Sequence, residues 1–389
     1  MEVEPMREFY FYGYPTQLSI STYEEVLSEY VDLISQDDNV LAVYQSGSIS
    51  VPGISDLDIF IVLDDPFNKN TIEVLRNWRR DMTSRYIFYH SPFIISKEDF
   101  PSIKYVHTAF NLRRIYGSEI PIINPSNDEI TFIKILNILD WSYILTVSLS
   151  EMFLRRKIHM RTALMTLGSV AHTLALAQDI LGCKDYRKII RSIRAFRRNF
   201  FKLPDHGYKY RMPDLIIKSF EALIDIVKHV TEYMLSMEYI YYDVHKNIKL
   251  QVRPDLIINF KSYKSTYDIY NGKLIKVLAI PIIAIELPNT FLIINSEYSK
   301  YCSQGILKVY RINSYYNLHL DNDFKHVIQK RMTLFNKIIK YIPEDFTQYI
   351  PINFYSKQDL CSNSYFIRTI FRTVINELKY LANQFRFKR

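Results

Sequence analysis

Hydrophobic and polar residues alternate with two different periods over residues 1–125. Apolar residues recur every three or four positions at 21–36 and 69–83, which predicts two helices, and Ser21 with Glu24 forms a capping box in the first. Short apolar runs predict strands at 40–45, 58–63 and 86–90, with an extension at 93–95 beyond the Pro92 break. This order of elements predicts a small mixed α/β domain.

A different pattern begins near residue 126. Long apolar segments predict helices at 130–154, 160–182 and 215–237, and the first is apolar nearly all round, as in a helix bundle. After Pro254 the pattern predicts strands at 257–260, 274–285 and 291–294, then helices at 323–341 and 364–385. We therefore expect an α+β protein with a mixed α/β domain at 1–125, an all-helical domain at 126–250 and a mixed α/β domain at 251–389.

The composition excludes a disordered or low-complexity chain, because 48% of the 389 residues are hydrophobic and 15% are aromatic. Cys183, Cys302 and Cys361 are far apart and form neither a CxxC motif nor a Cys/His cluster, which argues against a disulfide framework and a structural zinc site. The most apolar stretch, 274–295, is interrupted by two prolines and two charged residues. We therefore expect a cytoplasmic protein without a membrane span or an export signal.

Charge is distributed unevenly along the chain. Residues 1–125 carry 10 Lys/Arg against 18 Asp/Glu, whereas residues 126–389 carry 39 against 23. An acidic region could hold cations, and a basic region could attract a polyanion. The alternative is that many of the basic residues only solvate helix surfaces.

One basic run has a regular spacing. On a helix over 187–202, five basic residues at intervals of three or four would share one side, along roughly 22 Å. This basic stripe consists of Arg187, Arg191, Arg194, Arg198 and Lys202. The run contains no acidic residue, which favours contact with RNA or DNA over simple solvation and predicts binding that weakens with salt. A second basic cluster lies at 155–161.

Four residues between the first two predicted strands carry the strongest chemical signal. Gly47 and Ser48 follow the first strand in a turn that could hold a phosphate, and Asp56 and Asp58 lie at the start of the second. Residues i and i+2 of a strand project to the same side, so the two carboxylates would lie together. Carboxylates this close repel unless a cation lies between them, and Mg²⁺ suits such a pair.

This arrangement resembles the nucleotidyltransferase superfamily, the group with the polymerase-β-like catalytic fold. The family signature is a Gly-Ser turn followed about ten residues later by Asp-x-Asp at the start of a strand. The segment RRIYGSEIP at 113–121 is also similar to a segment that often closes this domain in small members. The resemblance covers roughly residues 20–125, and a helical second domain agrees with it.

The resemblance implies transfer of a nucleoside monophosphate from a nucleoside triphosphate to a hydroxyl group. Asp56 and Asp58 would hold two Mg²⁺ or Mn²⁺ ions, and Gly47 and Ser48 would hold the outer phosphates. The nucleotide would lie in the cleft between the first two domains. With the basic stripe, the favoured acceptor is a nucleic acid such as an RNA 3′ end. A protein side chain or a small molecule is the alternative acceptor.

The sequence departs from the family at one position. Members usually supply a third carboxylate from a later strand, but the matching segment SRYIFYHSPFIIS, 84–96, contains neither Asp nor Glu. His90 lies near the expected place and could act as a base. One alternative is a non-catalytic nucleic-acid-binding module that kept the fold, and another is a sugar-nucleotide transferase using Asp-x-Asp. The pattern assigns no role to 251–389 and no oligomeric state.

Overall fold

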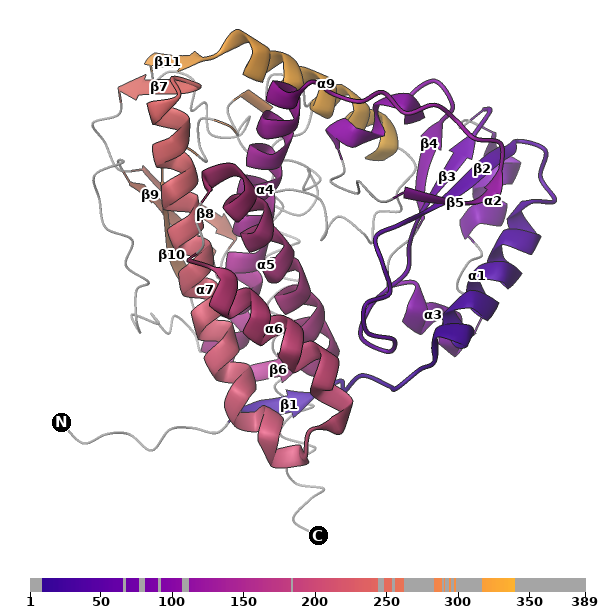
Figure 1. Ribbon diagram of the computed structural model, residues 1–389, viewed down its shortest axis with the longest axis horizontal. Coiled ribbons are helices and arrows are strands. Elements are labelled where there is room, and N and C mark those ends of the chain that lie inside the picture. The colour runs from indigo at the N-terminus through magenta and orange to yellow at the C-terminus, as the bar shows by residue number, and fades with distance from the viewer. Residues whose placement is uncertain are drawn as a thin grey trace. The chain divides into compact units, whose positions relative to one another are not determined.

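The computed structural model describes most of the first 243 residues and parts of the remainder (Figure 1). The described residues are 9–65, 68–76, 81–89, 92–106, 112–182, 185–243, 248–253, 256–261, 283–288, 290, 294, 297–298 and 317–339. The chain divides into two compact units, one of 1–241 with 318–349 and the other of 242–317 with 350–389. The predicted boundary near 125 therefore falls inside the first unit, and residues after 250 contribute to both.

A mixed four-stranded sheet forms one part of the first unit. Its strands are β2 (Val40–Ser46), β3 (Asp58–Leu63), β4 (Phe93–Ser96) and β5 (Leu112–Gly117). The strand order is β4-β3-β2-β5, with β2 antiparallel to both β3 and β5, and β3 parallel to β4. The predicted α+β class is confirmed at this level, as a mixed sheet accompanied by several helices.

Helix α1 (Ile20–Ile34) packs on one face of the sheet, together with residues of α3 (Met82–Ile87). Its N-cap is Ser19, whose side chain accepts a hydrogen bond from the Thr22 N–H, so the predicted capping box at Ser21 is wrong. The predicted strand at 86–90 is also wrong at its start, because Asp81 caps a short helix there by accepting from the Ser84 N–H at 2.8 Å. Helix α2 is Lys69–Arg76, shorter than predicted.

The opposite face of the sheet is covered by segments from two distant parts of the chain. The 3₁₀ helix η1 (Phe100–Tyr105) and helix α9 (Asn322–Ile339) pack there. Leu334 and Ile338 of α9 join Tyr44 and Phe60 of the sheet in one buried cluster. The core of the sheet region is therefore completed by a helix that lies more than 200 residues later in the sequence.

Long helices form the rest of the first unit (Figure 1). They are α4 (Asn127–Arg155), α5 (Met160–Leu181), α6 (Arg187–Asn199) and α7 (Asp205–Ser236), with the 3₁₀ turn η2 (Phe200–Lys202) before α7. A capping box of Ser126 and Glu129 begins α4, and Gly182, with a φ of 63°, ends α5 as predicted. Strand β1 (Tyr10–Tyr12) pairs in parallel with β6 (Lys157–His159), and the sequence predicted neither.

Helix α7 begins at Asp205, and Pro213 lies inside it. The predicted start after Pro213 is therefore wrong. Tyr208 and Met212 are buried and continue the apolar stripe of the helix toward its N-terminus. Packing of this first part outweighs the hydrogen bond that a proline cannot donate.

Two described helices, α4 and α5, are long and apolar enough to cross a membrane by length and composition alone. The sequence reading expected no membrane span. In α4, 67% of the most apolar window is buried inside the protein, which is also the pattern of a core helix in a bundle.

The second unit contains a three-stranded sheet of β8 (Ile248–Arg253), β9 (Leu256–Lys261) and β10 (Ile283–Pro288). Strand β9 is antiparallel to β8 and parallel to β10. Strand β7 (Ile240–Asp243) pairs separately with β11 (Asn317–Leu320). The strand predicted at 257–260 is present, Ile294 is helical where a strand was predicted, and the helix predicted at 364–385 lies outside the described residues.

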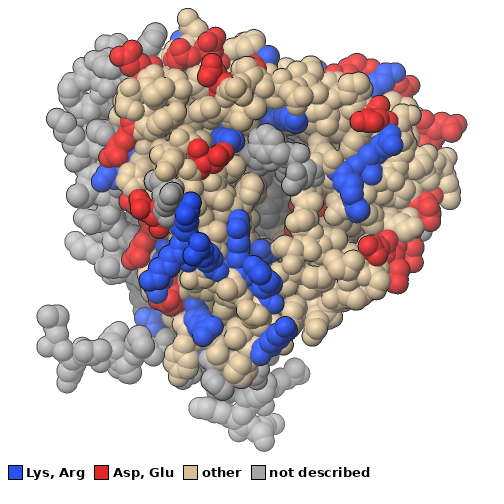
Figure 2. Space-filling view, in the orientation of Figure 1, with Lys and Arg blue, Asp and Glu red and all other residues tan. Residues whose placement is uncertain are grey.

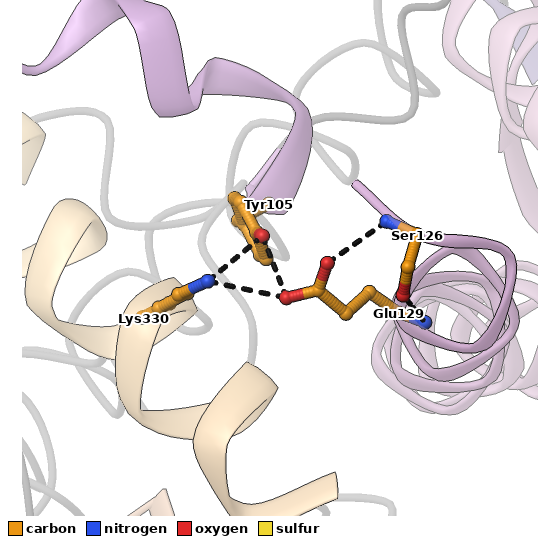
Figure 3. Close-up of polar contacts among 4 residues, drawn as sticks. All are labelled: Tyr105, Ser126, Glu129 and Lys330. Atoms are coloured by element: carbon orange, nitrogen blue, oxygen red, sulfur yellow. Dashed lines mark hydrogen bonds and ion pairs between the residues drawn. The ribbon is translucent and has the colours of Figure 1, made fainter. Parts of the chain in front are cut away.

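A polar cluster joins η1, α4 and α9 (Figure 3). The Glu129 carboxylate accepts hydrogen bonds from the Tyr105 hydroxyl at 2.8 Å, Lys330 Nζ at 3.1 Å and the Ser126 N–H at 2.9 Å. Burial alone would raise the pKa of Glu129, but these three donors outweigh it and lower the pKa to about 2. Beside it, Arg331 is 2% exposed and donates to Asp140 at 2.7 Å.

The Glu129 cluster makes stability depend on pH. Its folded pKa lies below the ordinary value of 4.5, so the stabilisation is present above that value and is lost as the pH falls toward 2. Between pH 6 and pH 3 we expect the wild type to lose roughly 1–3 kcal/mol more stability than Glu129→Gln. Thermal unfolding across this range measures the difference, with Asp128→Asn on the exposed side of α4 as control. Equal pH profiles for the wild type and Glu129→Gln would contradict the prediction.

Candidate nucleotide and metal site

The antiparallel pairing of β2 and β3 brings the two predicted motifs together. The last residue of β2, Ser46, pairs directly with the first residue of β3, Asp58. Directly opposed residues of an antiparallel pair project to the same face, with their Cβ atoms about 5 Å apart. Gly47 follows Ser46 with a φ of 68°, in the left-handed region, and nothing lies within 4 Å of where a Cβ would be. The Gly47–Ser48 turn therefore begins beside Asp58.

The loop that leads to the acids is held by hydrogen bonds to two tyrosines. The Tyr23 hydroxyl accepts from the Gly53 N–H at 3.0 Å and donates to the Ser55 carbonyl at 2.6 Å. The Tyr86 hydroxyl donates to the Gly53 carbonyl at 2.5 Å. Gly53 has a φ of 86°, and an added Cβ would lie 2.1 Å from the Thr16 carbonyl oxygen. This packing fixes the backbone that enters Asp56.

Asp56 and Asp58 are both partly exposed, whereas the intervening Leu57 and the next residue, Ile59, are buried. Leu57 and Ile59 belong to the core beneath α1 and α3. Within β3, strand alternation directs the Asp58 carboxylate away from the face of Ile59 and toward the same side as Ser46, and Asp56 lies two residues before the strand begins. The structure therefore places the four motif residues at one end of the β2–β3 hairpin.

A third acidic ligand is not found among the described residues. In that part of the chain, no group of three or more His, Cys, Asp or Glu side chains could hold a metal ion. Asp81 is engaged as the N-cap of α3, where hydrogen bonds from Ser84 lower its pKa, and Asp99 pairs with Lys337 at 2.5 Å. His90, the predicted base, lies outside the described residues.

The two aspartates fit Mg²⁺ or Mn²⁺ by donor type. Both offer hard oxygen ligands, and Mg²⁺ characteristically takes one or two protein carboxylates and completes its shell with water and phosphate oxygens. A cofactor ion would therefore be held by Asp56 and Asp58, with the phosphates next to Gly47 and Ser48.

Two arginines from the helical region lie near this site, and the sequence analysis did not assign either to it. Burial lowers the pKa of Arg197 on α6, and the negative charge of Asp56 acts in the opposite direction, so the two charges interact. Arg161 on α5 is 5% exposed, and its Cζ lies 3.6 Å from the centroid of the Tyr86 ring. The sequence signal for Arg161 was its place in the second basic cluster, at 155–161.

The basic stripe is on the surface of α6 and η2. All five of its residues are exposed, and on the same face Figure 2 shows blue side chains gathered over the region of α6. Ile190, Ile193 and Phe196 on the other side of α6 are buried. Arg197 lies between stripe residues on the same helix, and its charge interacts with that of Asp56.

A shallow hollow elsewhere on the first unit contains none of the predicted site residues. It is lined by Leu41, Lys97, Pro101 and 118–123. Leu41 lies near the start of β2, whereas Ser46 and the Gly47–Ser48 turn are at its other end.

His159 has a local structural role. It is the N-cap of α5, with Nδ1 accepting from the Thr162 N–H at 3.2 Å, and burial together with the charge of Arg161 lowers its pKa.

Comparisons of the chain with protein-family models, with curated proteins and with solved structures find no match. The resemblance to nucleotidyltransferases therefore stays a prediction from the Gly-Ser and Asp-x-Asp motifs.

Proposed function

We propose that this protein is a metal-dependent nucleotidyltransferase that moves a nucleoside monophosphate from a nucleoside triphosphate to a hydroxyl group. The observation that carries the proposal is the direct pairing of Ser46 with Asp58, which sets the Gly47–Ser48 turn beside the Asp56–Asp58 pair. A phosphate-binding turn next to two hard carboxylates is what a metal-chelated triphosphate requires.

Each residue has a defined role in the proposed reaction. The Ser48 hydroxyl and the backbone N–H groups of the turn bind the outer phosphates, and Asp56 and Asp58 hold the metal ions. When bound, Mg²⁺ or Mn²⁺ supplies charge stabilisation to the attacking oxygen and to the leaving pyrophosphate. His90 is the proposed base for the hydroxyl proton.

The test is incorporation of label from nucleoside triphosphates into an acceptor pool. Purified protein is incubated with α-labelled triphosphates, Mg²⁺ or Mn²⁺, and RNA. We expect RNA to become labelled, and a chelator to abolish the reaction. Labelling that continues in the chelator, or no labelling of RNA, protein or small hydroxyl compounds with either metal, contradicts the proposal.

RNA is the proposed acceptor because the basic stripe is exposed and lies mostly on α6, the helix of Arg197, whose charge interacts with that of Asp56. We expect Arg191→Gln, Arg194→Gln and Arg198→Gln together to weaken RNA binding and to reduce the slope of log affinity against log salt. The expected reduction is roughly 0.7 for each phosphate contact that is lost. Filter binding at several salt concentrations measures the slope.

Lys218→Gln is the matched control for the stripe, because Lys218 is an exposed cation on α7 that pairs with Asp214 at 2.8 Å. An unchanged salt-dependence slope in the triple variant would show that the basic stripe does not contact RNA. It would favour a protein or a small molecule as the acceptor.

A non-catalytic RNA-binding module is the second candidate, favoured by the lack of a three-ligand metal cluster among the described residues. It predicts RNA binding that is indifferent to Mg²⁺ and to loss of both aspartates, with no label transfer. The labelling assay therefore separates the two candidates.

A further inference from the structure

Two arginines of the helical region lie near the loop that carries Asp56: Arg161 is buried, and Arg197 is partly exposed with a buried Nε. Arg161 projects from α5, and Arg197 from α6. Neither belongs to the basic stripe, whose side chains are exposed. Arg197 packs so closely on α5 that a Cβ added to Gly168 would lie 2.6 Å from its Nη1.

Among the described residues, neither guanidinium group has a full set of hydrogen-bond partners. The buried Nε and Nη2 of Arg161 and the buried Nε of Arg197 have none there. The Arg161 cation lies over Tyr86, and the Tyr89 ring is 5.7 Å away, but such contacts offset only part of the cost of burying a charge. Arg331 is as buried as Arg161, yet it donates hydrogen bonds to acceptors in three residues.

Arg161 is placed at the loop by its aromatic neighbours. The Tyr86 ring beneath it is bonded through its hydroxyl to the Gly53 carbonyl. Burial raises the pKa of Tyr23, whose hydroxyl is also bonded to Gly53, and the charges of Arg161 and Asp56 both act on it. Arg161 and Asp56 are therefore close to the same loop.

Arg197 approaches the same loop from α6. Its charge interacts with that of Asp56, and Phe201, which follows α6, would lie 3.1 Å from a Cβ added to Gly53. The two arginines thus bring two positive charges, with unused N–H donors, to the loop that presents the acidic pair.

We propose that Arg161 and Arg197 form a subsite for the polyphosphate of the nucleoside triphosphate. The identity of the ligand rests on the proposed function, whereas the site itself rests on the buried N–H groups of Arg161 and Arg197 that have no hydrogen-bond partner among the described residues. Guanidinium groups present planar forks of N–H donors that match phosphate oxygens. A phosphate therefore supplies hydrogen-bond acceptors for the N–H donors that the described protein groups leave unpaired. The subsite binds the anion without a metal, because its positive charge belongs to the protein.

The test is titration calorimetry with inorganic tripolyphosphate in a buffer that contains a chelator. The wild type is expected to bind. Arg161→Gln and Arg197→Gln are each expected to lower the affinity roughly 10- to 100-fold, as for the loss of a charge-assisted hydrogen bond. Arg211→Gln is the matched control, since it makes the same change at an exposed position of α7 that lies outside the basic stripe. Equal affinity in the wild type and in both buried-site variants overturns the proposal.

Folding is checked by thermal unfolding of each variant. Arg161→Gln is expected to unfold at the same temperature as the wild type or higher, because it removes an incompletely paired buried cation. If this variant does not fold, Arg161→Lys and Arg197→Gln decide the question. Both are expected to weaken tripolyphosphate binding, and unchanged affinity in both overturns the proposal.

An RNA oligonucleotide distinguishes the two sources of phosphate. If Arg161→Gln and Arg197→Gln weaken RNA binding but leave tripolyphosphate binding unchanged, the subsite serves the acceptor and the proposal is overturned. The joint variant Asp56→Asn with Asp58→Asn is expected to keep tripolyphosphate binding while label transfer is lost. If the wild type transfers no label, the proposed function fails while arginine-dependent tripolyphosphate binding still supports the subsite. If the wild type transfers label but its tripolyphosphate binding does not depend on Arg161 and Arg197, the proposed function is supported and the subsite is overturned.

Discussion

Asp56→Asn and Asp58→Asn are each expected to lower the rate of nucleotidyl transfer by at least about a thousandfold, which corresponds to roughly 4 kcal/mol of transition-state stabilisation. Asparagine keeps the size of the side chain and its hydrogen-bonding ability, but it removes the charge that a metal ion requires. Initial rates of label transfer, at saturating triphosphate and metal, measure the effect.

Neither substitution should damage the fold. Both side chains are partly exposed at the end of the β2–β3 hairpin, while the buried Leu57 and Ile59 hold the strand in the core. We expect the stability to change by less than about 1 kcal/mol. Asp64→Asn, in the exposed residue that follows β3, is the control and should leave the rate unchanged. A single variant that keeps more than about a tenth of the activity would remove that aspartate from the metal site.

Arg331→Met is expected to destabilise the first unit by about 3–5 kcal/mol. The guanidinium of Arg331 is buried and donates to Asp140 at 2.7 Å, to the Asn137 side chain at 2.9 Å and to the Tyr105 carbonyl at 3.0 Å. Methionine fills much of the same space, but it leaves the Asp140 carboxylate, 8% exposed, without its cationic partner. Urea unfolding, followed by a probe in the first unit, measures the loss.

A second substitution separates the charge effect from the packing effect. Arg331→Met combined with Asp140→Leu should recover most of the loss, because an apolar pair often replaces a buried ion pair without cost. Lys330→Met is the matched control on the same helix. Its ion pair with Glu129 is 40% exposed on the lysine side and should contribute only about 1 kcal/mol. A loss below about 1 kcal/mol in Arg331→Met would contradict the role of this contact.

Local periodicity was sufficient for the elements whose faces are clearly apolar. Strands β2 and β3 and helices α1, α4, α5 and α6 lie close to the predicted segments, because side-chain spacing within one segment determines which face it buries. The segment around Tyr86 was misread, because a short aromatic run suits a strand or a buried helix equally. The Asp81 cap and the packing of Ile87 favour the helix.

Pairings between strands that are distant in the sequence could not be predicted from local periodicity. Strand β5 joins β2 across about 70 residues, and β1 joins β6 across about 145, so no local pattern identifies either partner. The candidate site also combines residues of one local segment with residues from distant segments. Gly47, Ser48, Asp56 and Asp58 share one hairpin and could be linked from the sequence, whereas Arg161 and Arg197 come from helices more than 100 residues later.

The late position of α9 has a consequence for synthesis on the ribosome. The apolar face formed by Ala42, Tyr44 and Phe60 is completed by Leu334 and Ile338, which are translated almost 300 residues afterwards. At roughly 5–20 residues per second, that interval is on the order of tens of seconds. During this time the nascent sheet exposes this apolar surface to solvent. We therefore expect a chaperone to cover it until α9 emerges from the ribosome.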